Sequence, residues 1–135
     1  MSNLDIAEKI IEGFYVDKSA FIVVSSRNKL SIKGSPSNKV FSKEALSKID
    51  LNINFIDSEN SVVFLGKNLK GSATITVRGS DSFIYIGNDC TFKKLIIDSN
   101  QKSDFVAIGN HVTTNFNCAF RSGLRATKYE IDSYE

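Results

Sequence analysis

The side chains best suited to chemistry in this chain are its single histidine, His111, and its two cysteines, Cys90 and Cys118. An imidazole changes charge near neutral pH and can act as a general base. His111 ends the run Gly109-Asn110-His111, where a polar turn residue that faces solvent is the structural alternative. A cysteine nucleophile needs an exposed, electropositive setting. Both cysteines lie among apolar residues, so we expect reduced thiols that fill core positions.

These residues belong to a repeat. A block of the form apolar-Gly-polar-polar-apolar occurs three times, and its glycines are 87 − 66 = 21 and 109 − 87 = 22 residues apart. A period of this length is typical of a solenoid, in which each coil completes a hydrophobic core begun by its neighbour. The copies are Leu65-Gly66-Lys67-Asn68-Leu69, Ile86-Gly87-Asn88-Asp89-Cys90 and Ile108-Gly109-Asn110-His111-Val112.

Each repeat is expected to contain two strands joined by a polar loop. Short apolar strands precede the glycines at Val62–Leu65, Phe83–Ile86 and Phe105–Ile108, and alternating strands lie at Leu51–Asp57, Ala73–Arg78 and Lys94–Asp98. At the bend, Gly adopts positive φ without steric cost, and Asn and Asp tolerate it best among the other residues. The predicted fold is all-β, a parallel β-helix of about four to five coils of 21–22 residues.

The N-terminal part is expected to cover one end of the coils. Apolar residues from Leu4 to Phe14 recur at helical spacing, which predicts an N-terminal capping helix. A second, short helical segment is expected from Ser42 to Ile49. The predicted organisation is residues 1–50 for the helix, cap and first strands, 51–124 for the β-helix coils and 125–135 for a polar tail.

The composition sets limits on function. Of 135 residues, 41% are hydrophobic, and 17 basic against 15 acidic residues give a net charge of +2. The charges are dispersed, so neither nucleic acid nor a membrane surface is expected as a partner. No apolar stretch reaches the roughly 20 residues of a membrane helix, and no secretory signal is visible, so we expect a cytoplasmic protein. The spacing of Cys, His and carboxylates matches no metal site.

The glycine blocks resemble the hexapeptide signature of the left-handed parallel β-helix, best known from the hexapeptide-repeat acyltransferases. The resemblance covers Leu51 to Phe120, and the run from Ile84 to Phe92 resembles bacterial enzymes that O-acetylate surface polysaccharides. Members of that group often carry a loop in each coil, which would extend three hexads, about 18 residues, to the observed period. The resemblance favours a left-handed helix, and a right-handed β-helix with longer coils stays open.

The resemblance also implies an activity and a set of site residues. It implies an acetyl-CoA-dependent O-acetyltransferase that acts on a bacterial surface polysaccharide or sugar precursor and assembles as a homotrimer. His111 would be the catalytic base, and Asp104 is a candidate partner carboxylate that it would meet across coils or subunits. Arg121, Arg125 and Lys128 could contact the phosphates of coenzyme A, with a solvated tail as the structural alternative.

Two other functions fit the same residues. The small number of coils and the structural explanation for His111 favour a non-catalytic β-helix module that oligomerises or docks another protein. Working enzymes of the family usually continue for several more coils, so we expect either a shortened relative or a piece of a longer protein. A carbohydrate-binding β-helix draws on the four tyrosines, but the absence of tryptophan counts against it.

Overall fold

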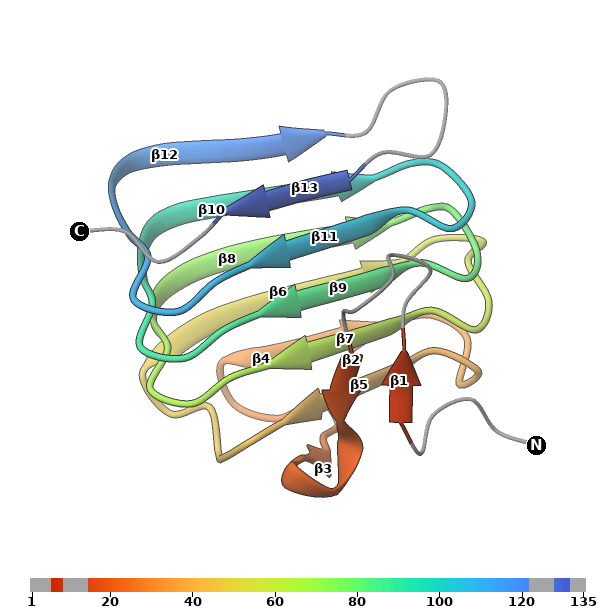
Figure 1. Ribbon diagram of the computed structural model, residues 1–135, viewed down its shortest axis with the longest axis horizontal. Coiled ribbons are helices and arrows are strands. Elements are labelled where there is room, and N and C mark those ends of the chain that lie inside the picture. Colours follow the sequence, from red (N-terminus) through yellow and green to blue (C-terminus); the bar gives the residue numbers. More distant parts are fainter. Residues whose placement is uncertain (1–5, 9–14, 122–127, 132–135) are drawn as a thin grey trace.

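The chain folds into a parallel β-solenoid of about four coils (Figure 1). The computed structural model describes residues 6–8, 15–121 and 128–131. Within these ranges there is no α-helix, and so no helix that could cross a membrane. One 3₁₀ turn, η1, spans Lys18–Ala20. The all-β solenoid predicted from the glycine spacing is confirmed.

Two sheets form the opposite walls of the solenoid. The first wall contains β4 (Leu30–Lys33), β6 (Ile49–Phe55), β8 (Lys70–Val77), β10 (Thr91–Ser99) and β12 (Thr113–Arg121), side by side in this order. The second contains β3 (Ile22–Val23), β5 (Lys39–Ser42), β7 (Val62–Leu65), β9 (Phe83–Ile86), β11 (Phe105–Ile108) and β13 (Lys128–Ile131). The pairings are parallel except that of β3 with β5. Each coil therefore adds one strand to each wall.

The register between strands gives the length of each coil. Leu30 pairs with Leu51, which pairs with Ala73, so these coils contain 51 − 30 = 21 and 73 − 51 = 22 residues. Lys39 pairs with Val62, a separation of 62 − 39 = 23 residues. Two extra residues lie in the bend between Asn54 and Val62, compared with that between Lys33 and Lys39. Register shifts within the strands occur where β10 pairs with β8 and with β12.

The main core lies between the two walls. Ile53, Ile75 and Ile97 are register partners on three successive strands, and each is 0% exposed. Val63 and Ile84, also fully buried, face them from the second wall. The first wall alternates buried and exposed residues because only one of its faces meets this core.

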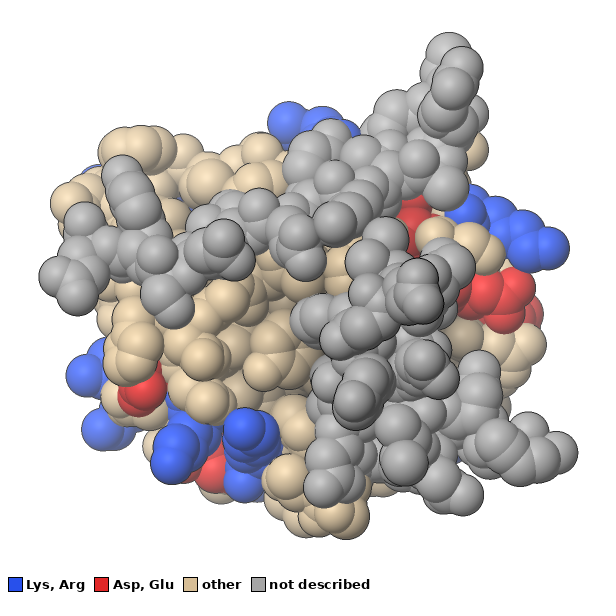
Figure 2. Space-filling model, in the orientation of Figure 1, with Lys and Arg blue, Asp and Glu red and all other residues tan. Residues whose placement is uncertain are grey.

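A second apolar cluster covers the outer face of the second wall. Phe41 and Phe64 stack with ring centroids 4.9 Å apart, and Phe64, Phe83 and Phe105 continue the row at 5.5 Å spacings. Phe21 packs edge-on against Phe64 at 5.2 Å. The strand β7 is therefore buried on both faces, which explains its uninterrupted apolar sequence. Figure 2 shows charged side chains gathered toward the strand ends, with an uncharged described surface between them.

The two predicted helical segments are not found. Ile6–Glu8, inside the expected capping helix, forms β1 and pairs antiparallel with β2 (Tyr15–Asp17); the rest of that expected helix lies outside the described residues. A short isolated helix is marginal, and strand pairing satisfies the same backbone groups. Residues 43–48 form a loop, in which the Ser42 hydroxyl accepts a hydrogen bond from the Glu44 N–H at 3.2 Å. Ser42 therefore caps a turn, and not a helix.

Candidate functional site

The glycine bends lie on top of one another along one edge of the solenoid. The Gly66 N–H donates to the Ile86 carbonyl at 2.7 Å, and the Gly87 N–H donates to the Ile108 carbonyl at 2.8 Å. A Cβ added to Gly66 would lie 2.5 Å from the carbonyl carbon of Gly87. Close backbone stacking, more than positive φ, therefore requires glycine at these positions.

Positive φ falls instead on the residue two places after each glycine. Asn68, Asp89 and His111 have φ values of 58°, 60° and 61°, so His111 occupies the same structural position as its two counterparts. The Asn68 side-chain amide donates to Asp89 Oδ1 at 2.9 Å, and His111 Nε2 lies 3.8 Å from Asp89 Oδ2. The His111 side chain is 62% exposed. At this edge, the exposed imidazole of His111 therefore lies beside the Asp89 carboxylate, which accepts a hydrogen bond from the Asn68 amide.

Asp104 lies at the other end of β11, in the opposite bend of the coil. It is 1% exposed, and its Oδ2 accepts hydrogen bonds from the Ser99 hydroxyl and the Gln101 N–H, both at 3.0 Å. Asp104 and Gly109, where the His111 corner begins, are five residues apart along an extended strand, which at about 3.3 Å per residue is roughly 17 Å. Within one chain the structure does not bring His111 and Asp104 together.

Asp104 is the last member of a buried polar column that the sequence analysis missed. Asn38, Ser61, Ser82 and Asp104 each precede a strand of the second wall, and all are buried. Ser61 N–H donates to Asn38 Oδ1 at 2.9 Å, and Ser82 N–H donates to Ser61 Oγ at 3.0 Å. These side chains satisfy backbone groups inside the bend. The signal was present in the sequence as small polar residues at a spacing of 82 − 61 = 21 and 104 − 82 = 22.

The cysteines are both free thiols. Cys90 is 0% exposed, between Leu69 and Val112 in the inward column, which confirms its predicted core position. Burial raises the pKa of the Cys90 thiol, with hydrogen bonding from the corner opposing that effect and the nearby Asp89 carboxylate adding to it. A raised pKa keeps the sulfur protonated and poorly nucleophilic. Cys118 lies half-buried on β12.

The predicted basic set is only partly described. Arg121 Nε donates to Asp98 Oδ2 at 3.2 Å, and Arg78 Nη1 lies 3.5 Å from the other oxygen of the same carboxylate. Arg121 therefore joins an ion-pair group on the outer face of the first wall. Arg125 lies outside the described residues, and Lys128 begins β13.

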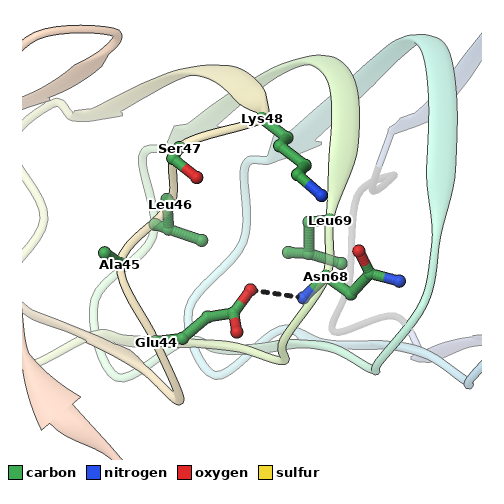
Figure 3. Close-up of a pocket in the computed structure, with 7 residues that line it drawn as sticks. All are labelled: Glu44, Ala45, Leu46, Ser47, Lys48, Asn68 and Leu69. Carbon is green, nitrogen blue, oxygen red and sulfur yellow. Dashed lines mark hydrogen bonds between the residues drawn. The ribbon is translucent and has the colours of Figure 1, made fainter.

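An open cleft lies beside the first corner, where the loop between β5 and β6 lacks the Gly-Asn pattern (Figure 3). Glu44 Oε2 accepts a hydrogen bond from the Asn68 N–H at 2.7 Å and so joins the loop to the next corner. Leu46 and Leu69 are 3% exposed, and the Lys48 and Ser47 side chains lie around the opening. The lining residues are Glu44, Ala45, Leu46, Ser47, Lys48, Asn68 and Leu69. Carboxylate, hydroxyl and ammonium groups of this kind can hold a small polar molecule, and the part of the chain in view contains no cluster of three metal-ligand side chains.

The fold and its bends define a parallel β-solenoid with stacked Gly-x-Asn/Asp/His corners. Comparison with known protein families, with curated proteins and with solved structures finds no match for this chain. The expected family and its acyltransferase activity therefore remain proposals that depend on the sequence pattern.

Proposed function

We propose that this chain is a non-catalytic β-solenoid module whose role is to assemble with protein. The observation that carries the proposal is that the candidate catalytic groups serve the fold. Asp104 accepts hydrogen bonds inside a buried bend, and Cys90 lies in the core. His111 occupies the corner position that Asn68 and Asp89 occupy in the neighbouring coils. The left-handed winding that the sequence pattern favours is part of this proposal.

The distance between His111 and Asp89 also favours a non-catalytic role for the edge that carries the glycine bends. A general base is usually hydrogen-bonded to the group that orients it, and heavy-atom distances in such bonds are about 2.6–3.2 Å, often longer without substrate. His111 Nε2 is 3.8 Å from Asp89 Oδ2, which is longer than a hydrogen bond, and Asn68 donates to the other oxygen, Oδ1. A half-exposed carboxylate in this position is a weak orienting group, because solvent competes for both partners.

Acetyl-CoA is the probe that tests the proposal. A non-catalytic module should show no increase in melting temperature at millimolar acetyl-CoA, since a ligand that binds only the native state stabilises it by an amount that grows with the logarithm of its concentration above the dissociation constant. Coenzyme A release in the presence of oligosaccharide acceptors should stay at the buffer rate. A melting temperature that rises steadily with acetyl-CoA concentration, together with acceptor-dependent release of coenzyme A, would overturn the proposal.

The second candidate is the O-acetyltransferase, favoured by the exposed imidazole of His111 beside Asp89. His111→Asn is the appropriate variant, because Asn68 shows that asparagine fits the same positive-φ corner. Loss of acetyl transfer in this variant, with an unchanged melting temperature, would support the enzyme. Asn110→Asp, a change to the neighbouring corner residue, serves as the matched control and should retain transfer.

A further inference from the structure

The two walls of the solenoid end in four edge strands, and three of them are protected against pairing with another chain. An exposed edge is normally blunted by shortness, by charge or by a covering segment. The edge strand β3 has only two residues. The edge strand β13 is also short, with four residues.

The third protected edge, β4, is covered by its own chain. Arg27 and Leu30 exchange two backbone hydrogen bonds of 2.7 and 2.8 Å. The Ser26 hydroxyl accepts from the Ile32 N–H at 2.8 Å and donates to the Ile32 carbonyl at 3.0 Å. The outward N–H and C=O groups of both Leu30 and Ile32 are therefore used, and no strand can be added at this end.

Among the described residues, the fourth edge, β12, shows none of these protections. It is nine residues long, and among the described strands it pairs only with β10. Its first eight residues, 113–120, carry no charge. Phe116 is 70% exposed, an unusual state for a large apolar side chain, and Thr113, Asn115, Asn117 and Ala119 are exposed as well.

We propose that β12 pairs antiparallel with β12 of a second copy of this chain, which gives a two-fold symmetric dimer. The inference rests on the assembly role proposed above and names its partner. The covered β4 edge prevents head-to-tail stacking of two copies, so between copies of this chain the open β12 edge can pair only with another β12 edge. An uncharged strand also pairs with itself without like-charge repulsion.

The extent of the uncharged, accessible segment places the two-fold axis. Residues 113–119 are centred on Phe116, so partners in the pairing would have numbers that sum to 2 × 116 = 232. The facing pairs are then Phe116 with the partner's Phe116, Asn115 with the partner's Asn117, Thr114 with the partner's Cys118 and Thr113 with the partner's Ala119. Aromatic and amide pairs of this kind stabilise cross-strand contacts.

One feature of β12 opposes continuous pairing, and the same axis accounts for it. The register with β10 shifts where Asn115 and Phe116 occur, so β12 bulges at this point. A bulge interrupts the ladder locally. Because it coincides with the axis, the two exposed Phe116 rings meet where backbone hydrogen bonds are lost, and strand pairing continues on both sides.

Sedimentation equilibrium of the full chain is the first test. We expect a concentration-dependent dimer, and Phe116→Lys should raise the dissociation constant at least about tenfold by placing like charges across the axis. Asn28→Lys, at the covered end, is the matched control and should leave the dimer unchanged. A monomer at all concentrations, or an assembly that Phe116→Lys leaves intact, overturns the inference.

Disulfide trapping tests the axis itself. Phe116→Cys in a Cys118→Ser background should form a covalent dimer under mild oxidation, whereas Asn28→Cys in the same background should stay monomeric. Covalent dimers of the second variant alone would overturn the inference. These outcomes are separate from the acetyl-CoA experiment, since a dimer that transfers acetyl groups would contradict the proposed function and leave the interface standing.

Discussion

Each bend on the glycine edge has two steric requirements, and a different residue meets each one. The glycine allows neighbouring coils to approach, and the residue two places later adopts positive φ. Asparagine, aspartate and histidine occupy the second position in successive coils. These three residue types are found at positive φ more often than other non-glycine residues. The identity of His111 therefore follows from its place in the bend without a catalytic role.

Replacing one of the stacked glycines should destabilise the whole chain. In Gly87→Ala the new Cβ would lie 2.5 Å from Asn110 Oδ1 and 2.8 Å from the Gly109 carbonyl. We expect a loss of about 1–3 kcal/mol in unfolding free energy, as for other overpacked sites. Urea unfolding measures it, with Ser72→Ala on the outer face as a control that stays within about 0.5 kcal/mol. Equal stability of both variants would mean that the coils are not in close contact here.

Glu59 gives the chain a specific dependence on pH. Hydrogen bonds from Ser37, and then from Ser35, hold the pKa of the Glu59 carboxyl below its ordinary value of 4.5. The ionised form is thus favoured in the folded state, so its stabilisation is present above pH 4.5 and is lost as the pH falls through the lower, folded value. Urea midpoints measured on both sides of pH 4.5 should fall less steeply in Ser37→Ala than in the parent chain. Identical slopes would contradict this role of the serine.

At the scale of elements, the second wall is stabilised by two apolar faces. Its inner face joins the main core, and its outer face forms the aromatic row that includes Phe41, Phe64 and Phe83. Aromatic neighbours at these separations add to the free energy of simple burial. The short strands of this wall are therefore held more firmly than their length of four residues suggests.

Removing the central ring of this row should be costly. Phe64 is 0% exposed and contacts three aromatic neighbours, so Phe64→Ala should lower the unfolding free energy by about 3–5 kcal/mol. Phe116→Ala is the same chemical change at a 70% exposed site and should have little effect in dilute solution. Denaturant unfolding of the two variants measures the contrast. Similar losses would show that the outer row contributes no packing.

The strands next to the glycines were the most predictable elements. Val62–Leu65, Phe83–Ile86 and Phe105–Ile108 are observed with the boundaries expected from the sequence, because Gly ends each apolar run sharply. The strand β5 and the loop after it were not foreseen, since the first corner lacks the Gly-Asn signal.

For the site, the corner position of His111 followed from the repeat. The separation of His111 from Asp104 also follows from the sequence, because the predicted strand Phe105–Ile108 lies between them. The spacing of the small polar residues before each strand points to the buried polar column, but spacing alone does not tell that their side chains are buried and bonded to backbone groups.

At the scale of the whole molecule, each coil contacts mainly its neighbours, so stability should vary along the axis. Hydrogen exchange followed by mass spectrometry should find the slowest amides in β6 to β9, which have a paired coil on each side, with faster exchange in β4 and β12 at the ends. Uniform protection across all coils would contradict this expectation and indicate a single cooperative unit.

The buried polar column has a consequence for how such a molecule changes in length. The side chains of Asn38 and Ser61 each accept a hydrogen bond from the backbone N–H of the next member, one coil further along. Duplicating or deleting one complete unit of 21 to 23 residues therefore restores the same contacts at the new junction. Evolution can lengthen or shorten this protein in steps of one coil, about 4.8 Å of height each, without redesigning the interior.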